Sequence, residues 1–251
     1  MIDLAPIRAF LDDRHLALAE ELQAFVAAEI APLPPPVDDD AGRRQAREIV
    51  GLLGKATLMR FLAPVDLRAL CLVREALAHA SPLADDVFAL QCLGAMPILL
   101  GGTAEQKERF AAPILAGRAL AAFAMTEPEA GSDVAALATR ALPEGDGYRL
   151  DGKKTLISNA GIADLYTVFA STDPARGARG ISCFVVEASA VGFVRAQFTS
   201  EPHPLGELAF DCVVGGDARI GAEGGGFKLG MAALDRLRPT VAAAATGMAA
   251  R

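Results

Sequence analysis

The polar groups most able to do chemistry are concentrated in the stretch FAMTEPEAGSD, residues 123–133, directly after an apolar run. It carries two hydroxyls and three carboxylates, on Thr126, Ser132, Glu127, Glu129 and Asp133. Such a turn could cap a helix, act as an acid–base site, or hold a ligand through hydroxyls and backbone. Because most polar turns carry no chemistry, the residues alone favour a structural turn.

Two later segments carry further candidates. KKTLISNAG, residues 153–161, reads as a strand that ends in Ser158 and Asn159; taken alone, it is an ordinary strand closing in a turn. ALDRLRP, residues 233–239, places Asp235 and Arg238 at i, i+3 on one helix face. That spacing also fits a plain surface ion pair.

Composition excludes several classes of protein. The formal net charge is −7 and the basic residues are scattered, which argues against a nucleic-acid surface. The longest uncharged stretch, residues 87–104, is interrupted by Gly, Pro and Gln, so no membrane span is expected. The three histidines show no metal-ligand spacing. No signal peptide is visible, and we expect a cytoplasmic protein.

The candidate residues must be positioned by two kinds of element. Helical periodicity over the first 120 residues predicts five helices, at 13–30, 42–62, 67–80, 85–101 and 103–117. The last of these begins with a capping box, Thr103 followed by Gln106. A proline-rich run at residues 31–36 separates the first two helices.

After Gly117 the periodicity becomes that of short strands, at 148–158, 163–171, 181–189, 192–199 and 206–214. Asp151-Gly152 predicts a hairpin turn inside the first of them. The spacing favours an antiparallel sheet or small barrel. From residue 223 a helical pattern returns and runs uncapped to Arg251, which indicates a fold that continues.

The predicted fold is therefore α+β in three parts. Residues 1–120 form a helical domain, 121–222 an antiparallel β-barrel-like domain, and 223–251 the first helix of a further helical domain.

Taken together and in this order, the segments resemble the acyl-CoA dehydrogenase family over most of the chain. TEPEAGSD is close to the family's T-E-P-x-A-G-S-D signature, and GKKTLISNAG is similar to its K-x-W-I-T-N segment. The segment 221–251 is similar to its glycine-rich turn and the helix that follows. The resemblance implies FAD as cofactor and α,β-dehydrogenation of an acyl thioester, carried by CoA or a carrier protein. An electron-transfer flavoprotein or another acceptor would take the electrons, and the enzyme would be a homodimer or homotetramer.

The resemblance also implies roles for single residues. The loop from Phe123 to Ser132 would run along the flavin, with Thr126 and the backbone at Met125 bonding the ring and Gly131 allowing close approach. Ser132 would face the flavin phosphate or the acyl-CoA. Leu156, Ile157 and Ser158 would contribute from the strand, with Ser158 in the place of the family's threonine. Asp235 and Arg238 match the D-x-x-R that contacts CoA.

This sequence departs from the family pattern in two ways that bear on function. Leu156 replaces the family's tryptophan, and leucine can cover a flavin face but cannot stack on it as indole does. The family's catalytic glutamate falls beyond Arg251, and neither Glu127, Glu129 nor Glu207 matches it; we expect a truncated chain, the alternative being a bundle supplied by another chain. Two other functions therefore stay open: a flavin oxidase or hydroxylase, and a non-catalytic acyl-CoA- or acyl-carrier-binding protein.

Overall fold

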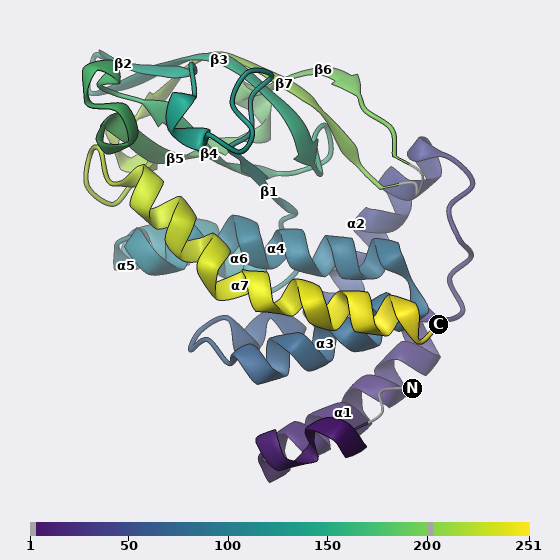
Figure 1. Cartoon of the computed structure of the whole chain (residues 1–251). Helices are drawn as coiled ribbons and strands as arrows, with labels where there is room; N and C mark the ends of the chain where they lie inside the picture. The colour runs from purple at the N-terminus through teal and green to yellow at the C-terminus, as the bar shows by residue number, and fades with distance from the viewer. Residues whose placement is uncertain (1–3, 200–202) are drawn as a thin grey trace.

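The structure, a computed structural model, describes residues 4–199 and 203–251. Its first half is helical, as the sequence predicts (Figure 1). The elements of this half are η1 (Ala5–Phe10), α1 (Asp13–Phe25), η2 (Val26–Ile30), α2 (Asp39–Lys55), η3 (Leu58–Phe61), α3 (Leu67–Ala80), α4 (Pro82–Gly101), α5 (Ala104–Gln106), η4 (Lys107–Ala111) and α6 (Ala112–Leu115). The capping box forms as expected: Thr103 accepts the backbone N–H of Gln106, and the Gln106 side chain accepts the N–H of Thr103.

The second half is one mostly antiparallel sheet followed by a helix, as expected. Its strands are β1 (Ala121–Ala124), β2 (Arg140–Glu144), β3 (Gly147–Ser158), β4 (Leu165–Ser171), β5 (Ile181–Glu187), β6 (Gly192–Ala196), β7 (Leu205–Gly215) and β8 (Arg219–Ile220), and the helix is α7 (Gly226–Ala249). The strand order is β6-β7-β3-β2-β4-β5-β8, with β1 joined in parallel to β4. The path ends at β6 and β8 without pairing them, so the sheet is open, and "barrel-like" describes it only loosely.

Helix α4 is the central element of the helical half. It contacts α2, α3, α7 and β1, and its side chains are apolar on nearly every face. By length and composition α4 could cross a membrane, but about two thirds of its apolar window is buried inside the protein. Its apolar surface is therefore explained by packing in the core.

The prediction differs from the structure most clearly in the second helix and at Asp151-Gly152. The second helix ends at Lys55, and residues 58–61 form a separate 3-10 turn after Thr57, whose φ is 52°. Asp151-Gly152 is not a hairpin turn, because β3 runs straight through it and Gly152 pairs with Phe210 of β7. The β2–β3 reversal instead lies between Glu144 and Gly147. Gly152 is explained by packing, since a Cβ there would lie 2.5 Å from the Thr139 hydroxyl.

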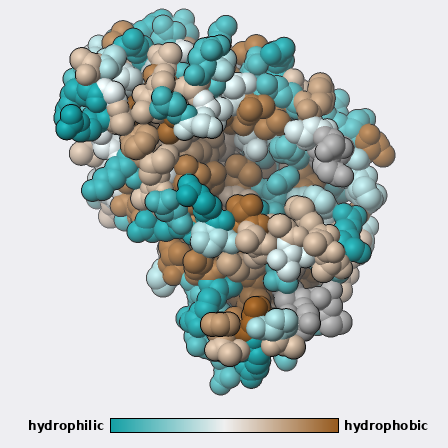
Figure 2. Space-filling view, in the orientation of Figure 1, coloured by the Kyte–Doolittle hydropathy of each residue, from teal (hydrophilic) through white to brown (hydrophobic). Residues whose placement is uncertain are grey.

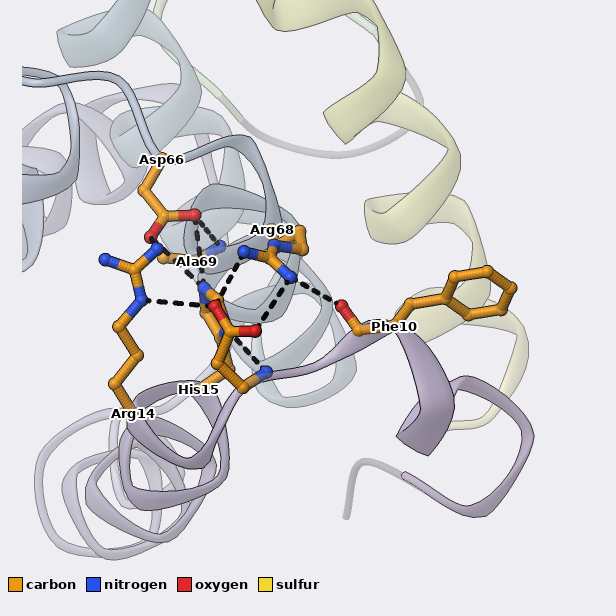
Figure 3. A network of polar contacts seen from close by, with 7 residues as sticks. Phe10, Arg14, His15, Asp66, Arg68 and Ala69 are labelled. Atoms are coloured by element: carbon orange, nitrogen blue, oxygen red, sulfur yellow. Dashed lines mark hydrogen bonds and ion pairs between the residues drawn. The ribbon is translucent and has the colours of Figure 1, made fainter.

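A polar network joins α1 to the start of α3 (Figure 3). The buried His15 ring places Nε2 3.2 and 3.1 Å from the two Asp66 carboxylate oxygens, and Asp66 also accepts the N–H of Ala69 as the N-cap of α3. Burial raises the pKa of Asp66, but the bonds from Ala69 and His15, with Arg14 nearby, outweigh it and leave that pKa below its usual value. The network fixes the first helix on the domain core.

Candidate functional site

The polar turn (residues 126–132) is held in shape by Glu127. The backbones of Glu127 and Ala130 exchange both hydrogen bonds, at 3.1 and 3.2 Å. The Glu127 carboxylate is 5% exposed and accepts the N–H groups of Ala138 at 2.5 Å and Thr139 at 3.0 Å. Glu129, by contrast, is exposed, as expected for a solvated carboxylate. Glu127 therefore has a structural role in the turn.

Lys154 of β3 completes this arrangement and was not singled out by the sequence reasoning. Its side chain is fully buried, and Nζ donates to the Met125 carbonyl at 3.0 Å and to Glu127 Oε1 at 2.8 Å. Burial lowers the pKa of Lys154 to about 8, against the opposing effect of Glu127. Burial raises the pKa of Glu127, but Lys154 and the donors around it outweigh this and hold that pKa below its usual value. Both groups are therefore charged at neutral pH.

The strand that faces the turn is distorted where the candidate residues lie. The register of β3 with β7 shifts between Lys154 and Ile157, and we refer to residues 155–158 as the β3 bulge. Leu156 has a φ of 54°, an unfavourable conformation for a leucine. Gln197 supports it, since Oε1 accepts the Leu156 N–H at 2.8 Å and Nε2 donates to the Thr155 hydroxyl at 3.0 Å. A strained residue braced in this way is a candidate for function.

The polar turn and the β3 bulge lie side by side. The Thr155 N–H donates to the Thr126 carbonyl at 3.0 Å. Lys154 donates to Glu127 in the turn and to the carbonyl of Met125 directly before it. Sequence positions about thirty residues apart are thereby joined into one surface.

The predicted site residues differ in what they present on that surface. Leu156 is 57% exposed, whereas Ile157 is 2% exposed and can offer only its backbone. Met125 is 4% exposed and its carbonyl is taken by Lys154. Phe123 packs on Phe169, with ring centroids 4.9 Å apart. Phe123 and Met125 therefore form the floor of the site.

The chemistry of this surface fits a planar heteroaromatic group such as a flavin. Within the described residues, the hydroxyls of Thr126, Ser132 and Ser158 make no hydrogen bond, so they are available to a ligand. A Cβ placed on Gly131 would meet none of the described atoms within 4 Å. The exposed Leu156 side chain supplies an apolar ledge beside these donors.

The predicted substrate pair lies further along α7. Asp235 and Arg238 form an exposed ion pair at 3.5 Å, each side chain 69% exposed. Helix α7 meets the floor of the site at Gly230, where a Cβ would lie 2.3 Å from Met125 Cε. Arg238 follows eight residues later, about 12 Å along the helix axis. The structure therefore places the pair beside the site and does not bring it into contact with the polar turn.

Comparison with known proteins agrees with this geometry. The domain family described as "Acyl-CoA dehydrogenase, N-terminal domain" matches residues 12–118, and the one described as "Acyl-CoA dehydrogenase, middle domain" matches residues 122–213. The probable acyl-CoA dehydrogenase fadE25 of Mycobacterium leprae is 37% identical over 95% of this chain and 64% of its own length. The chain thus spans just under two thirds of this relative.

Solved structures give the same picture. The chain is similar to one in the structure of the electron transferring flavoprotein of Acidaminococcus fermentans, with a TM-score of 0.86, 32% identity, and 94% and 65% of the two chains covered. For butyryl-CoA dehydrogenase from Megasphaera elsdenii the TM-score is 0.80 and the identity 30%, with 94% of this chain and 66% of that chain covered. For PigA, solved with FAD and proline, the TM-score is 0.79 and the identity 27%, with 96% of this chain and 66% of that chain covered. The chain belongs to the acyl-CoA dehydrogenase family and carries the family's N-terminal and middle domains.

Proposed function

We propose that the protein takes part in FAD-dependent α,β-dehydrogenation of an acyl thioester. The observation that carries the proposal is the joining of the polar turn to the β3 bulge. It combines an apolar ledge with hydroxyls that make no hydrogen bond to any other described residue. Because the chain spans 64% of its relative's length, the activity of the whole protein is itself part of the proposal.

Each residue of the surface has a specific part in this function. The Thr126 and Ser158 hydroxyls would donate to heteroatoms at the ring edges, and the Leu156 side chain would cover a ring face. Ser132, beside the open position at Gly131, would bond the phosphate or the thioester. Asp235 and Arg238 would hold the CoA part of the substrate. Bound FAD supplies the two-electron acceptor for the hydride leaving the β-carbon.

We propose that the base lies outside residues 1–251. Glu127 is committed to Lys154 and two backbone donors. Glu207 accepts from Arg195 at 2.9 and 2.7 Å, and this hydrogen bonding lowers its pKa. A carboxylate held in its charged form by fixed donors is a poor proton acceptor at neutral pH.

The partners belong to the same proposal. An electron-transfer flavoprotein or another acceptor would reoxidise the enzyme, which we propose to be a cytoplasmic homodimer or homotetramer. A flavin oxidase or hydroxylase remains the alternative on the same scaffold. A non-catalytic acyl-thioester-binding protein is the alternative without redox chemistry.

Anaerobic titration with acyl-CoA tests the proposal. The whole FAD-loaded protein, including the part that supplies the base, should lose its visible flavin absorption when a saturated acyl-CoA of suitable length is added, and recover it with an electron acceptor. Rapid recovery with oxygen alone would favour the oxidase. A protein that binds acyl-CoA but takes up no FAD would overturn both redox functions and leave the binding protein.

A further inference from the structure

A groove runs between α3, α4 and α7, which lie side by side in Figure 1. Its volume is about 360 Å³. Most of its lining is apolar, from Leu70, Phe88, Ala89, Leu93, Leu234 and Val241. On the face of the molecule drawn in Figure 2, apolar surface lines a hollow between the sheet domain and the helices below it. A groove of this size and lining is suited to a small apolar ligand or to part of a larger one.

The groove and the proposed site share helix α7 as a wall. Helix α7 touches the floor of that site at Gly230, below Met125, and the groove begins one turn later at Leu234. Arg238, which we propose to bind CoA, lines the groove as well. A thioester held between Arg238 and the polar turn would therefore have the groove available for its acyl chain.

Most polar groups in the groove are already satisfied. Arg74 donates to both oxygens of Asp85, at 2.7 and 2.6 Å, and to the Thr240 hydroxyl at 3.1 Å. Arg74 therefore needs no anionic ligand to complete its bonding. Arg238 forms only an exposed ion pair with Asp235, at 3.5 Å, and stays accessible to the CoA part of the substrate.

Asp86 is different. It lines the groove and is partly buried, yet among residues 4–199 and 203–251 no hydrogen bond or ion pair reaches its carboxylate. Burial raises the pKa of Asp86; the charges of His203 and Arg74 oppose this, and that of Asp85 adds to it. His203, Arg74 and Asp85 affect Asp86 through their charges, without a hydrogen bond or ion pair to its carboxylate. A half-buried carboxylate without a donor is costly unless a partner arrives.

We propose a substrate class from the position of the Asp86 carboxylate in an apolar groove; this proposal rests on the proposed function. The acyl chain carries a cationic amino group toward its end, and Asp86 receives that group. A plain alkyl chain would cover the Asp86 carboxylate and leave it without a hydrogen-bond partner. A chain ending in a carboxylate would place like charges together beside Asp85 and Asp86. An ammonium instead gains a charge-assisted hydrogen bond.

Calorimetric titration of the protein with a matched set of thioesters tests this proposal. The set is hexanoyl-CoA, ω-aminohexanoyl-CoA and adipoyl-CoA, which differ only in the end of the chain. We expect the amino compound to bind about tenfold or more tighter than hexanoyl-CoA, the ratio given by one hydrogen bond to a charged group. Adipoyl-CoA should bind most weakly.

The variant Asp86→Asn removes the charge with little change of shape and should bring the amino and alkyl compounds within about twofold of each other. Asp146→Asn, on the exposed β2–β3 turn, is the matched control and should keep the full preference. Equal binding of amino and alkyl compounds by the unaltered protein would overturn the substrate class alone. Binding of none of the three would overturn the proposed function as well.

Discussion

Among single residues, Lys154 and Glu127 do most to shape the proposed site. The pair joins the polar turn to β3, and both side chains are buried. A buried ion pair adds little net stability, but breaking it leaves an uncompensated charge in the interior. Its role is therefore to position the turn against the bulge.

Glu127→Gln should lower the free energy of unfolding by about 3–5 kcal/mol, because it keeps the size of the side chain but removes the charge that pairs with the Lys154 ammonium. It also replaces one of the two accepting oxygens by an NH2 donor. The matched control is Asp211→Asn, which breaks the exposed pair with Arg149 and should cost at most about 1 kcal/mol. Urea unfolding followed by circular dichroism measures both values. Equal effects of the two substitutions would contradict a buried, energetically important pair.

The same carboxylate predicts a pH dependence. Its folded-state pKa lies below the ordinary 4.5, so the unfolded chain binds more protons in that range and stability falls as the pH falls. The stability contributed by Glu127 is complete above about pH 4.5 and is lost as the pH drops toward the folded value. The stability difference between wild type and Glu127→Gln should therefore hold down to about pH 4.5 and shrink as the pH falls further. A difference that stays constant below about pH 4.5 would show that Glu127 is not held in its charged form.

Among the helices and strands, close packing explains why the predicted end of α2 was wrong. Helix α2 ends at Lys55 because its last turn meets the end of α6: a Cβ on Gly54 would lie 2.3 Å from the Ala116 carbonyl. That contact forms only in the folded chain and does not alter the hydrophobic periodicity of the sequence. In contrast, the predicted range of α3, residues 67–80, agrees with the structure. The start of this helix is marked by its N-cap residue, Asp66, which is a local signal in the sequence.

Two glycines of α2 test this explanation. Gly54→Ala should destabilise the protein by about 1–3 kcal/mol, because the added methyl has to displace backbone. Gly51→Ala, in the same helix, meets none of the described atoms within 4 Å and should be neutral or stabilise by up to about 1 kcal/mol. Thermal unfolding compares the two. Similar effects of both substitutions would contradict the close approach of α2 to the end of α6.

At the scale of the whole molecule, the order of helices, sheet and helix could be predicted because each has its own hydrophobic period. Strand β1 was missed, since its four residues AAFA show no alternation and pair in parallel with β4 only in the folded chain. Among the site residues, Thr126, Ser132 and Ser158 were predicted from the sequence motifs that contain them. Lys154, Gln197 and Asp86 were not singled out, because their importance comes from partners, or the lack of them, that only the fold defines.

The proposed function requires that the polar turn and the β3 bulge form one flavin site. Titration of the apoprotein with FAD, followed by flavin fluorescence, measures whether they do. We expect saturable binding that Ser158→Ala weakens about three- to tenfold, the effect of one hydrogen bond. Ser189→Ala, an exposed serine of the same domain, should leave it unchanged. Binding of FAD with equal affinity by both variants and the wild type would contradict the site, and so would the absence of FAD binding by the folded protein.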